Sequence, residues 1–157
     1  MKKIALCTLI IAIMLTALVG CGSNKGGETS VDLQAFMDDL QGKYELGSVM
    51  PVDDEMLSAF YPGLAEIETV QRVAYMPMIT GRVSEYIFME CANTADVEKA
   101  TGLLQTRVDE QAAGGAFYPE AVEAWAKAKI LTHGNYVLLI AAGDTTDSIA
   151  ADFEALF

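Results

Sequence analysis

Residue types that carry covalent catalysis are few in this chain of 157 residues. It contains one histidine, His133, and three cysteines, of which only Cys91 lies beyond residue 21. Nucleophilic catalysis needs a nucleophile, a base and a group that orients the base. His133 lies beside a predicted turn without an evident partner, and Cys91 ends an apolar segment, which is typical of a small buried residue. A Cys91–His133 dyad would require the two segments to meet, so the sequence favours binding over catalysis, with no catalytic residue assigned.

Acidic and sulfur-containing residues are numerous but match no metal-binding or glycosidase pattern. The acidic pairs Asp38-Asp39, Asp53-Asp54 and Asp109-Glu110 are typical of helix starts and solvated faces in a chain with 22 acids. A glycosidase would need two carboxyls across a cleft. Met76 and Met78 offer thioethers of the kind that bind Cu(I), but methionines on strands are usually core residues. Because calcium-binding and phosphate-binding loop motifs are also missing from the sequence, we expect no metal and no cofactor other than the lipid described next.

The clearest chemical signal lies at the N-terminus. Two lysines precede an uncharged, mostly apolar run from Ile4 to Val19, which overlaps the sequence Leu18-Val19-Gly20-Cys21. This order is typical of a secretory signal peptide, and the run is shorter than the roughly 20 residues of a membrane-spanning helix. The four residues resemble the bacterial lipobox, in which the cysteine is thioether-linked to diacylglycerol and becomes the first residue after cleavage. We predict cleavage after Gly20 and lipidation of Cys21; an uncleaved signal anchor is the alternative.

The resulting domain boundaries are a signal peptide over 1–20, the lipidated cysteine and a flexible, glycine-rich tether over 21–29, and one domain over 30–157. A multiply acylated cysteine, carrying for example palmitate, anchors a protein without a transmembrane helix. The predicted location is therefore the extracytoplasmic face of the cell membrane. The chain has 22 acids and 10 bases, and two of the bases, Lys2 and Lys3, would leave with the signal peptide, so the mature net charge is 8 − 22 = −14. This charge excludes nucleic acid as a partner.

Beyond residue 29, hydrophobic periodicity predicts alternating helices and strands. A first helix is capped within Thr29-Ser30-Val31-Asp32 and ends at Gly42, with an apolar stripe of helical spacing. The other predicted elements are a short helix over 53–60, strands over 66–77 and 83–91, a helix over 95–113, a helix that begins at Pro119, strands over 130–133 and 136–142, and a last helix capped by Asp144 or Thr145.

The strands are predicted to form two antiparallel hairpins. Gly134-Asn135 is a good two-residue hairpin turn, and the strand over 83–91 is apolar on both faces, which indicates a central or covered position. The predicted fold is therefore α+β, a single-domain layer sandwich with about four mostly antiparallel strands as two hairpins and helices packed on the sheet. Trp125 is predicted to be a core residue. Tyr118, on the loop after Gly114-Gly115, and His133 are the candidate residues of a binding groove.

Several segments together resemble a known family. They are Met76 to Cys91, the helix that carries Arg107 and Gln111, Tyr118-Pro119, and the run from Gly134 to Leu139. They are similar to small lipoproteins of mainly clostridial, Gram-positive bacteria that contain the domain of unknown function DUF4358. The resemblance implies a lipoprotein on the outer face of the cytoplasmic membrane with no established activity. It also suggests an accessory role in modifying cell-surface polymers.

These observations favour a lipid-anchored binding or scaffold module for another envelope component, a protein or a surface polymer. The alternatives are a small envelope enzyme, either a hydrolase or an acyl-transfer enzyme, and a solute-binding receptor. The 137 residues left after the 20-residue signal peptide are short for a receptor with two closing lobes. An enzyme predicts a deep pocket that holds Cys91, His133 or a perturbed acid, whereas a scaffold predicts an exposed apolar patch.

Overall fold

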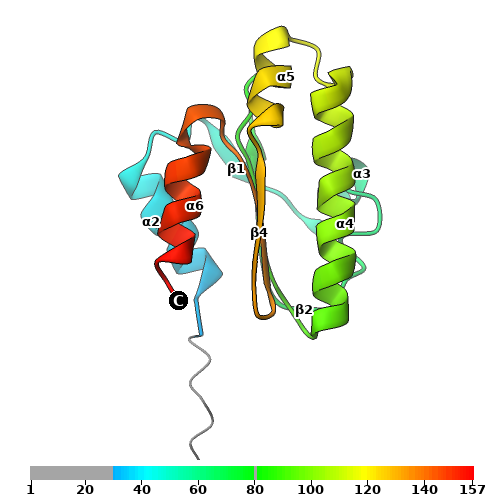
Figure 1. Cartoon of the computed structure of the whole chain (residues 1–157), viewed down its shortest axis with the longest axis vertical. Coiled ribbons are helices and arrows are strands. Elements are labelled where there is room, and N and C mark those ends of the chain that lie inside the picture. The colour runs from blue at the N-terminus through cyan, green and yellow to red at the C-terminus, as the bar shows by residue number, and fades with distance from the viewer. Residues whose placement is uncertain (1–29, 80) are drawn as a thin grey trace, which may run out of the picture. The chain divides into compact units, whose positions relative to one another are not determined.

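An antiparallel sheet of five strands lies between two layers of helices (Figure 1). The computed structural model describes residues 30–79 and 81–157, and residues 31–157 form one compact unit. The predicted signal peptide, Gly20, Cys21 and the tether lie outside the described residues. The strands are β1 (Val49–Pro51), β2 (Thr69–Pro77), β3 (Glu85–Cys91), β4 (Lys129–His133) and β5 (Tyr136–Ala141), in the spatial order β1-β2-β3-β5-β4.

All neighbouring strands pair antiparallel, with β2–β3 and β4–β5 as the two hairpins. The α+β prediction is confirmed, and so is the covered position of β3, which lies at the centre of the sheet between β2 and β5. The sheet has one strand more than predicted. The additional strand, β1, is only three residues long and contains Pro51, so it has no clear strand pattern in the sequence. Proline is found in sheets mainly on edge strands such as this one.

Helices cover both faces of the sheet. One layer contains α2 (Leu33–Lys43) and α6 (Thr146–Glu154), and the other contains α3 (Asp54–Phe60), α4 (Thr94–Glu110) and α5 (Pro119–Ala126). A wide π-helical turn over Gln111–Gly115 connects α4 toward α5, and a short 3-10 turn over Gly143–Thr145 precedes α6. Each layer encloses its own apolar core against the sheet.

Strand alternation explains the two cores. In β3, Ile87 and Met89 point toward α4, while Tyr86 and Phe88 point toward α2 and α6. Successive side chains of a strand face opposite sides of a sheet, so a strand covered on both faces needs apolar residues at consecutive positions. β3 and β5 have such runs, and every residue of β5 is buried.

Local sequence signals define the start of α2 and the break after α4. The predicted stripe of α2 is buried, and its N-cap is Asp32, the last residue of the predicted capping segment, whose side chain accepts from two backbone N–H groups. The predicted break after α4 lies at Gly114, whose φ of 108° suits glycine. Pro119 occupies the first turn of α5, as predicted.

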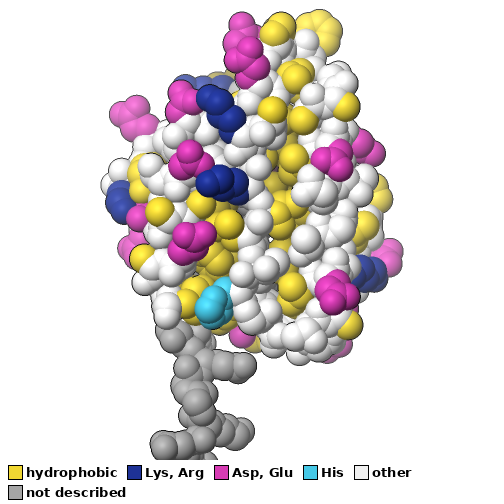
Figure 2. Space-filling view, viewed as in Figure 1, with side chains coloured by type: hydrophobic (Ala, Val, Ile, Leu, Met, Phe, Trp, Pro, Cys, Tyr) yellow, Lys and Arg dark blue, Asp and Glu magenta, His cyan; other side chains and the backbone are white. Residues whose placement is uncertain are grey.

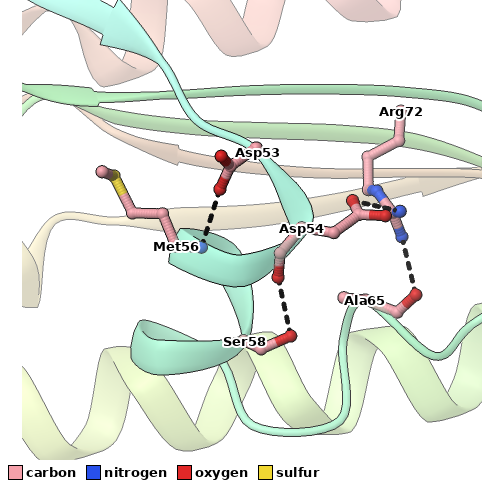
Figure 3. Close-up of polar contacts among 6 residues, drawn as sticks. All are labelled: Asp53, Asp54, Met56, Ser58, Ala65 and Arg72. Carbon is pink, nitrogen blue, oxygen red and sulfur yellow. Dashed lines mark hydrogen bonds and ion pairs between the residues drawn. The ribbon is translucent and has the colours of Figure 1, made fainter.

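Polar contacts hold the short helix α3 on the sheet (Figure 3). Asp53 caps it by accepting from the Met56 N–H at 2.9 Å. Arg72 of β2 bridges two parts of the chain, because it pairs with Asp54 at 2.6 Å and donates to the Ala65 carbonyl at 3.3 Å. A helix of one to two turns is marginal by itself, so these contacts matter for the placement of the residues that α3 contributes to the site below.

Candidate functional site

A pocket of about 590 Å³ opens between the sheet and the layer of α3, α4 and α5. It lies at the end of the sheet where β2 ends and β3 begins. Its volume is in the range of ligand sites in proteins. The walls consist mainly of methionine and aromatic side chains with two arginines and one glutamate: Met50, Met56, Phe60, Met76, Met78, Ile79, Arg82, Glu85, Arg107, Gln111, Phe117, Tyr118 and Trp125 are among the lining residues.

Methionine is concentrated in this pocket. The chain has six methionines beyond residue 21, and four of them line the walls: Met50, Met56, Met76 and Met78. Met50 of β1 and Met76 of β2 are direct cross-strand neighbours, so the strand that sequence analysis missed supplies one of these side chains. Methionine is flexible and polarizable and is frequent at surfaces that adapt to apolar partners. The two guanidinium groups in the same walls make the pocket unfavourable for a cation such as Cu(I).

A buried ion pair forms the polar floor of the pocket. Glu85 is 7% exposed, and its Oε1 accepts from Arg107 Nη2 at 3.0 Å while its Oε2 accepts from the Tyr61 hydroxyl at 2.6 Å. Glu85 is the first residue of β3 and lies on the α4-facing side of that strand, with Ile87 and Met89. Burial, then the Glu85 carboxylate, raises the pKa of Tyr61 well above its usual range. Tyr61 therefore stays protonated and serves as a hydrogen-bond donor.

Arg107 is surrounded by aromatic rings. Its guanidinium carbon lies 5.3–5.6 Å from the ring centroids of Phe60, Tyr61 and Trp125, within the range of cation–π attraction. Its Nε is buried without a hydrogen-bond partner among the described residues. Trp125 is buried, as predicted, and thus serves both the core and the pocket. Sequence analysis did not identify Glu85 or Arg107 as a pair; the available signal was a lone acid at the start of an apolar strand.

An exposed apolar rim surrounds the pocket. It consists of Phe60, Met78, Ile79, Phe117 and Tyr118, all of which are exposed and line the walls. Phe117 is 88% exposed, and its ring packs edge-on against Tyr118. Figure 2 shows apolar side chains at the surface at the upper end of the molecule, over α5 and the chain that leads to it. The rim therefore joins the β2–β3 loop to the α4–α5 connection.

Glycine allows the two loops of the rim to approach each other. A Cβ atom at Gly81 would lie 2.9 Å from Cε2 of Tyr118, and the φ of Gly81 is 95°. Both facts favour glycine at this position. Tyr118, a sequence-predicted groove residue, therefore does line a pocket, where its ring packs over the backbone of the β2–β3 loop.

His133 lies elsewhere. Its ring stacks on Phe157 at a centroid distance of 3.8 Å, beside a different and smaller hollow near the end of α6. The structure therefore does not bring Tyr118 and His133 together in one groove. The His133 end of the molecule is visible as the cyan side chain in Figure 2.

The hairpins do meet near Cys91, but without forming a dyad. The Cys91 N–H donates to the Asn135 carbonyl at 2.8 Å. The Cys91 side chain lies in the core under α4, whereas His133 stacks on Phe157 on the α6 side of the sheet. Burial, with Asp96 adding to it, raises the pKa of the Cys91 thiol. The thiol is a core group, in agreement with the prediction.

Within residues 30–79 and 81–157, clusters of three or more His, Cys, Asp or Glu side chains with the arrangement of a metal site do not occur. The helices described there are all too short or too polar to cross a membrane.

Comparison with known proteins identifies one family. The family described as Domain of unknown function (DUF4358) matches residues 43–142. The match extends from the end of α2 to the residue after β5 and includes the pocket. No curated protein and no solved structure matches the chain.

Proposed function

The chain belongs to the family of domain of unknown function DUF4358, and from its pocket and rim we propose that it is a binding module that docks a protein of the cell envelope. The proposal includes a lipid anchor at Cys21 after cleavage at Gly20, which would hold the domain on the extracytoplasmic face of the membrane. An accessory role in surface-polymer modification would follow if the docked protein acts on such polymers.

The observation that carries the proposal is the clustering of exposed apolar side chains. Eight large apolar side chains of the described residues are exposed, and five of them, Phe60, Met78, Ile79, Phe117 and Tyr118, belong to the rim. Single exposed apolar residues are normal, but a contiguous apolar patch marks an interaction surface.

The composition of this surface also favours a protein partner. The central parts of protein interfaces are enriched in aromatic residues, methionine and arginine, and the residues that dominate binding energy are most often Trp, Tyr and Arg in well-packed pockets. The pocket combines these types in Trp125, Tyr118 and Arg107. The rim is also spread over two loops and the end of α3, so a partner larger than the pocket could bury it.

The position of the pocket fits a domain anchored by its N-terminus. The Val31 N–H donates to the Tyr136 hydroxyl at 3.0 Å, and the Val31 carbonyl accepts from Gln71 at 3.0 Å. These contacts place the start of the domain near the β4–β5 turn, at the end of the sheet opposite Glu85. The seven residues of β3 separate the two ends by about 20 Å. A partner in the pocket would therefore bind away from the attachment point.

Photocrosslinking tests the proposal in native membranes. Phe117→benzoylphenylalanine places the reactive group on the rim. Val70→benzoylphenylalanine is the matched control, because Val70 is an exposed apolar residue, 66% accessible, that does not line the pocket. We expect one predominant adduct with an envelope protein from position 117, and we expect this adduct to be missing from position 70. The Ile79→Ser variant should reduce this adduct while its circular dichroism spectrum stays unchanged.

The possible outcomes separate the candidate functions. An identical adduct pattern from positions 117 and 70, or no protein adduct from position 117, would contradict a docking role for the rim. A thermal shift with a small solute and no protein adduct would instead support a solute-binding receptor. Turnover of an added ester or glycan by the purified protein would support the envelope enzyme. Comparison with Cys21→Ser shows whether the adduct requires the anchored form.

A further inference from the structure

We propose that the partner inserts a segment in which an apolar side chain stands next to a single carboxylate, and that Arg82 pairs with this carboxylate. This inference deepens the docking role and rests on it. The apolar side chain would enter among the methionines, and the carboxylate would remain at the mouth of the pocket.

The charged groups in the pocket walls are Arg82, Arg107 and Glu85. Glu85 is buried, and each of its carboxylate oxygens already accepts a hydrogen bond, from Tyr61 or from Arg107. Arg107 donates to Glu85 through Nη2, and its guanidinium is covered by three rings, so that only 15% of its side chain is exposed. An incoming segment therefore meets Arg82 as the accessible charge, and arginine has donors but no acceptor. The complementary group on the partner is an acceptor with negative charge.

Arg82 is placed for this role. It is exposed and forms no ion pair with the residues that the structure describes. A Cβ atom at Gly47 would lie 2.7 Å from Arg82 Nη1, so the guanidinium packs closely over the backbone of Gly47. Arg82 also lines a second hollow beside Tyr44 and Val49, and thus stands on the ridge between two concave surfaces. A carboxylate can approach a guanidinium in this position with two parallel hydrogen bonds.

The charge of the domain limits the partner to one carboxylate at this point. The mature chain has a net charge of −14 by the count of 8 bases and 22 acids, so a run of acidic residues would be repelled. At physiological ionic strength the repulsion is screened over about 8 Å. A single carboxylate in contact with Arg82 is therefore favoured over an acidic stretch. The apolar walls provide the rest of the contact.

A protein segment fits the surface better than a free amphiphile does. A small molecule that fills the pocket would contact the inner side of the apolar rim but leave its outer side exposed, above all at Phe117, which is 88% exposed. Burial of that rim needs a larger partner, because apolar stabilisation scales with the area removed from water.

The test uses two matched peptides and the only tryptophan of the chain, Trp125, which lines the pocket. The probes are acetylated, amidated octapeptides with the centre Leu-Phe-Glu-Leu or Leu-Phe-Gln-Leu, added to the full chain in phosphatidylcholine vesicles. We expect the Glu peptide to change Trp125 fluorescence with a Kd about threefold to fivefold lower than that of the Gln peptide. Arg82→Gln should abolish the difference. Lys99→Gln, which removes an exposed base outside the pocket, should preserve it.

Each outcome bears on one of the two proposals. Equal binding of both peptides to the wild-type chain would overturn the role of Arg82, while the docking role would stand on the photocrosslinking result. If the Arg82→Gln variant still prefers the Glu peptide, the proposed role of Arg82 is overturned as well. A further outcome is that neither peptide binds, while the anionic dye anilinonaphthalene sulfonate binds and Arg82→Gln weakens its binding. This result would assign the pocket to a free amphiphile and overturn the proposal that a protein segment binds there. If the photocrosslinking experiment gives no adduct at position 117 while the peptide preference is observed, the docking role is overturned.

Discussion

At the scale of single residues, two buried tyrosines differ in the contacts of their hydroxyl groups. The Tyr61 hydroxyl donates to Glu85 at 2.6 Å, whereas the Tyr86 hydroxyl forms no hydrogen bond of normal geometry among the described residues and has the Ser84 side chain as a polar neighbour. A buried polar group without a partner is unfavourable, and a hydrogen bond to a charged group is stronger than a neutral one. The two tyrosines therefore form a matched pair for mutation to phenylalanine.

We expect Tyr61→Phe to lower the free energy of unfolding by about 2 kcal/mol, because Glu85 loses a charged hydrogen bond in a buried site. Tyr86→Phe should instead change it by no more than about 0.5 kcal/mol, because the hydroxyl that it removes has only a weak, neutral contact with Ser84 and the ring packing stays intact. Urea unfolding at pH 7 measures both values. Equal losses in the two variants would contradict the hydrogen-bond assignment.

Stability at alkaline pH depends on the same side chains. Burial raises the pKa of Tyr86 from 10.0 to about 12. Between these values the unfolded chain loses the phenolic proton while the folded chain keeps it, so folding stability falls as the pH rises through this window. Two units correspond to about 2.7 kcal/mol. Because the folded chain is itself half deprotonated at pH 12, the wild type should lose about 2 kcal/mol more stability than Tyr86→Phe between pH 9.5 and pH 12. Urea unfolding across that range measures this difference, and parallel curves would refute it.

At the scale of elements, the pocket depends on how two loops approach each other. Gly81 and Gly114 both have positive φ, at 95° and 108°, but only a Cβ at Gly81 would meet Tyr118. Alanine at positive φ costs roughly 1 kcal/mol at either site. Gly114→Ala is thus a control for backbone strain, since nothing lies within 4 Å of the added carbon.

We expect Gly114→Ala to lower stability by about 1 kcal/mol and to leave the rim unchanged. Gly81→Ala should have a similar or larger effect on stability and should also weaken the position-117 adduct, because Tyr118 must move away from the β2–β3 loop. The double variant Gly81→Ala, Tyr118→Ala should be about as stable as Gly114→Ala, because the clash with the Tyr118 ring is removed and the backbone strain remains. Thermal unfolding and adduct yield measure these effects; equal adduct yields in the two alanine variants would rule out a role for this contact.

At the scale of the whole molecule, the proposed lipid anchor at Cys21 gives the first prediction. We predict that Cys21→Ser moves the protein from the membrane to the soluble extracytoplasmic fraction and abolishes palmitate labelling, without a change in circular dichroism. Cys7→Ser is the matched control, because Cys7 lies in the predicted signal peptide, and its fractionation should equal that of the wild type. A Cys21→Ser protein that stays in the membrane fraction would contradict the lipobox prediction.

The separation between the start of the domain and the pocket gives a second prediction at this scale. Trp125 lies in the pocket, at the opposite end of the sheet from the contacts of Val31. Brominated lipids quench tryptophan only at close range, so they should not quench Trp125 in the anchored protein. The variant Ser30→Trp with Trp125→Phe moves the reporter to the first described residue and should show stronger quenching. Strong quenching of Trp125 would indicate that the apolar rim contacts the membrane instead of a protein.

The sequence by itself determined the local structure. The stripe of α2, the Gly134-Asn135 turn, the proline at the start of α5 and the doubly apolar β3 were all predicted, because capping, turn formation and face-by-face burial act over a few neighbouring residues. Family membership was also predicted from short segments, and the profile match over residues 43–142 confirms it. β1 was missed because three residues with a proline carry almost no periodic signal.

Only the tertiary structure decided which buried faces meet. Glu85 and Arg107 are 22 residues apart and pair because the start of β3 lies under α4, and Met50 joins Met76 through an edge strand. Tyr118 precedes α5 and His133 ends β4; Tyr118 lines the pocket, whereas His133 stacks on Phe157 beside a different hollow. Periodicity encodes that a side chain is buried, but the partner it is buried against depends on long-range packing of the helices on the sheet. The candidate site is a product of that packing.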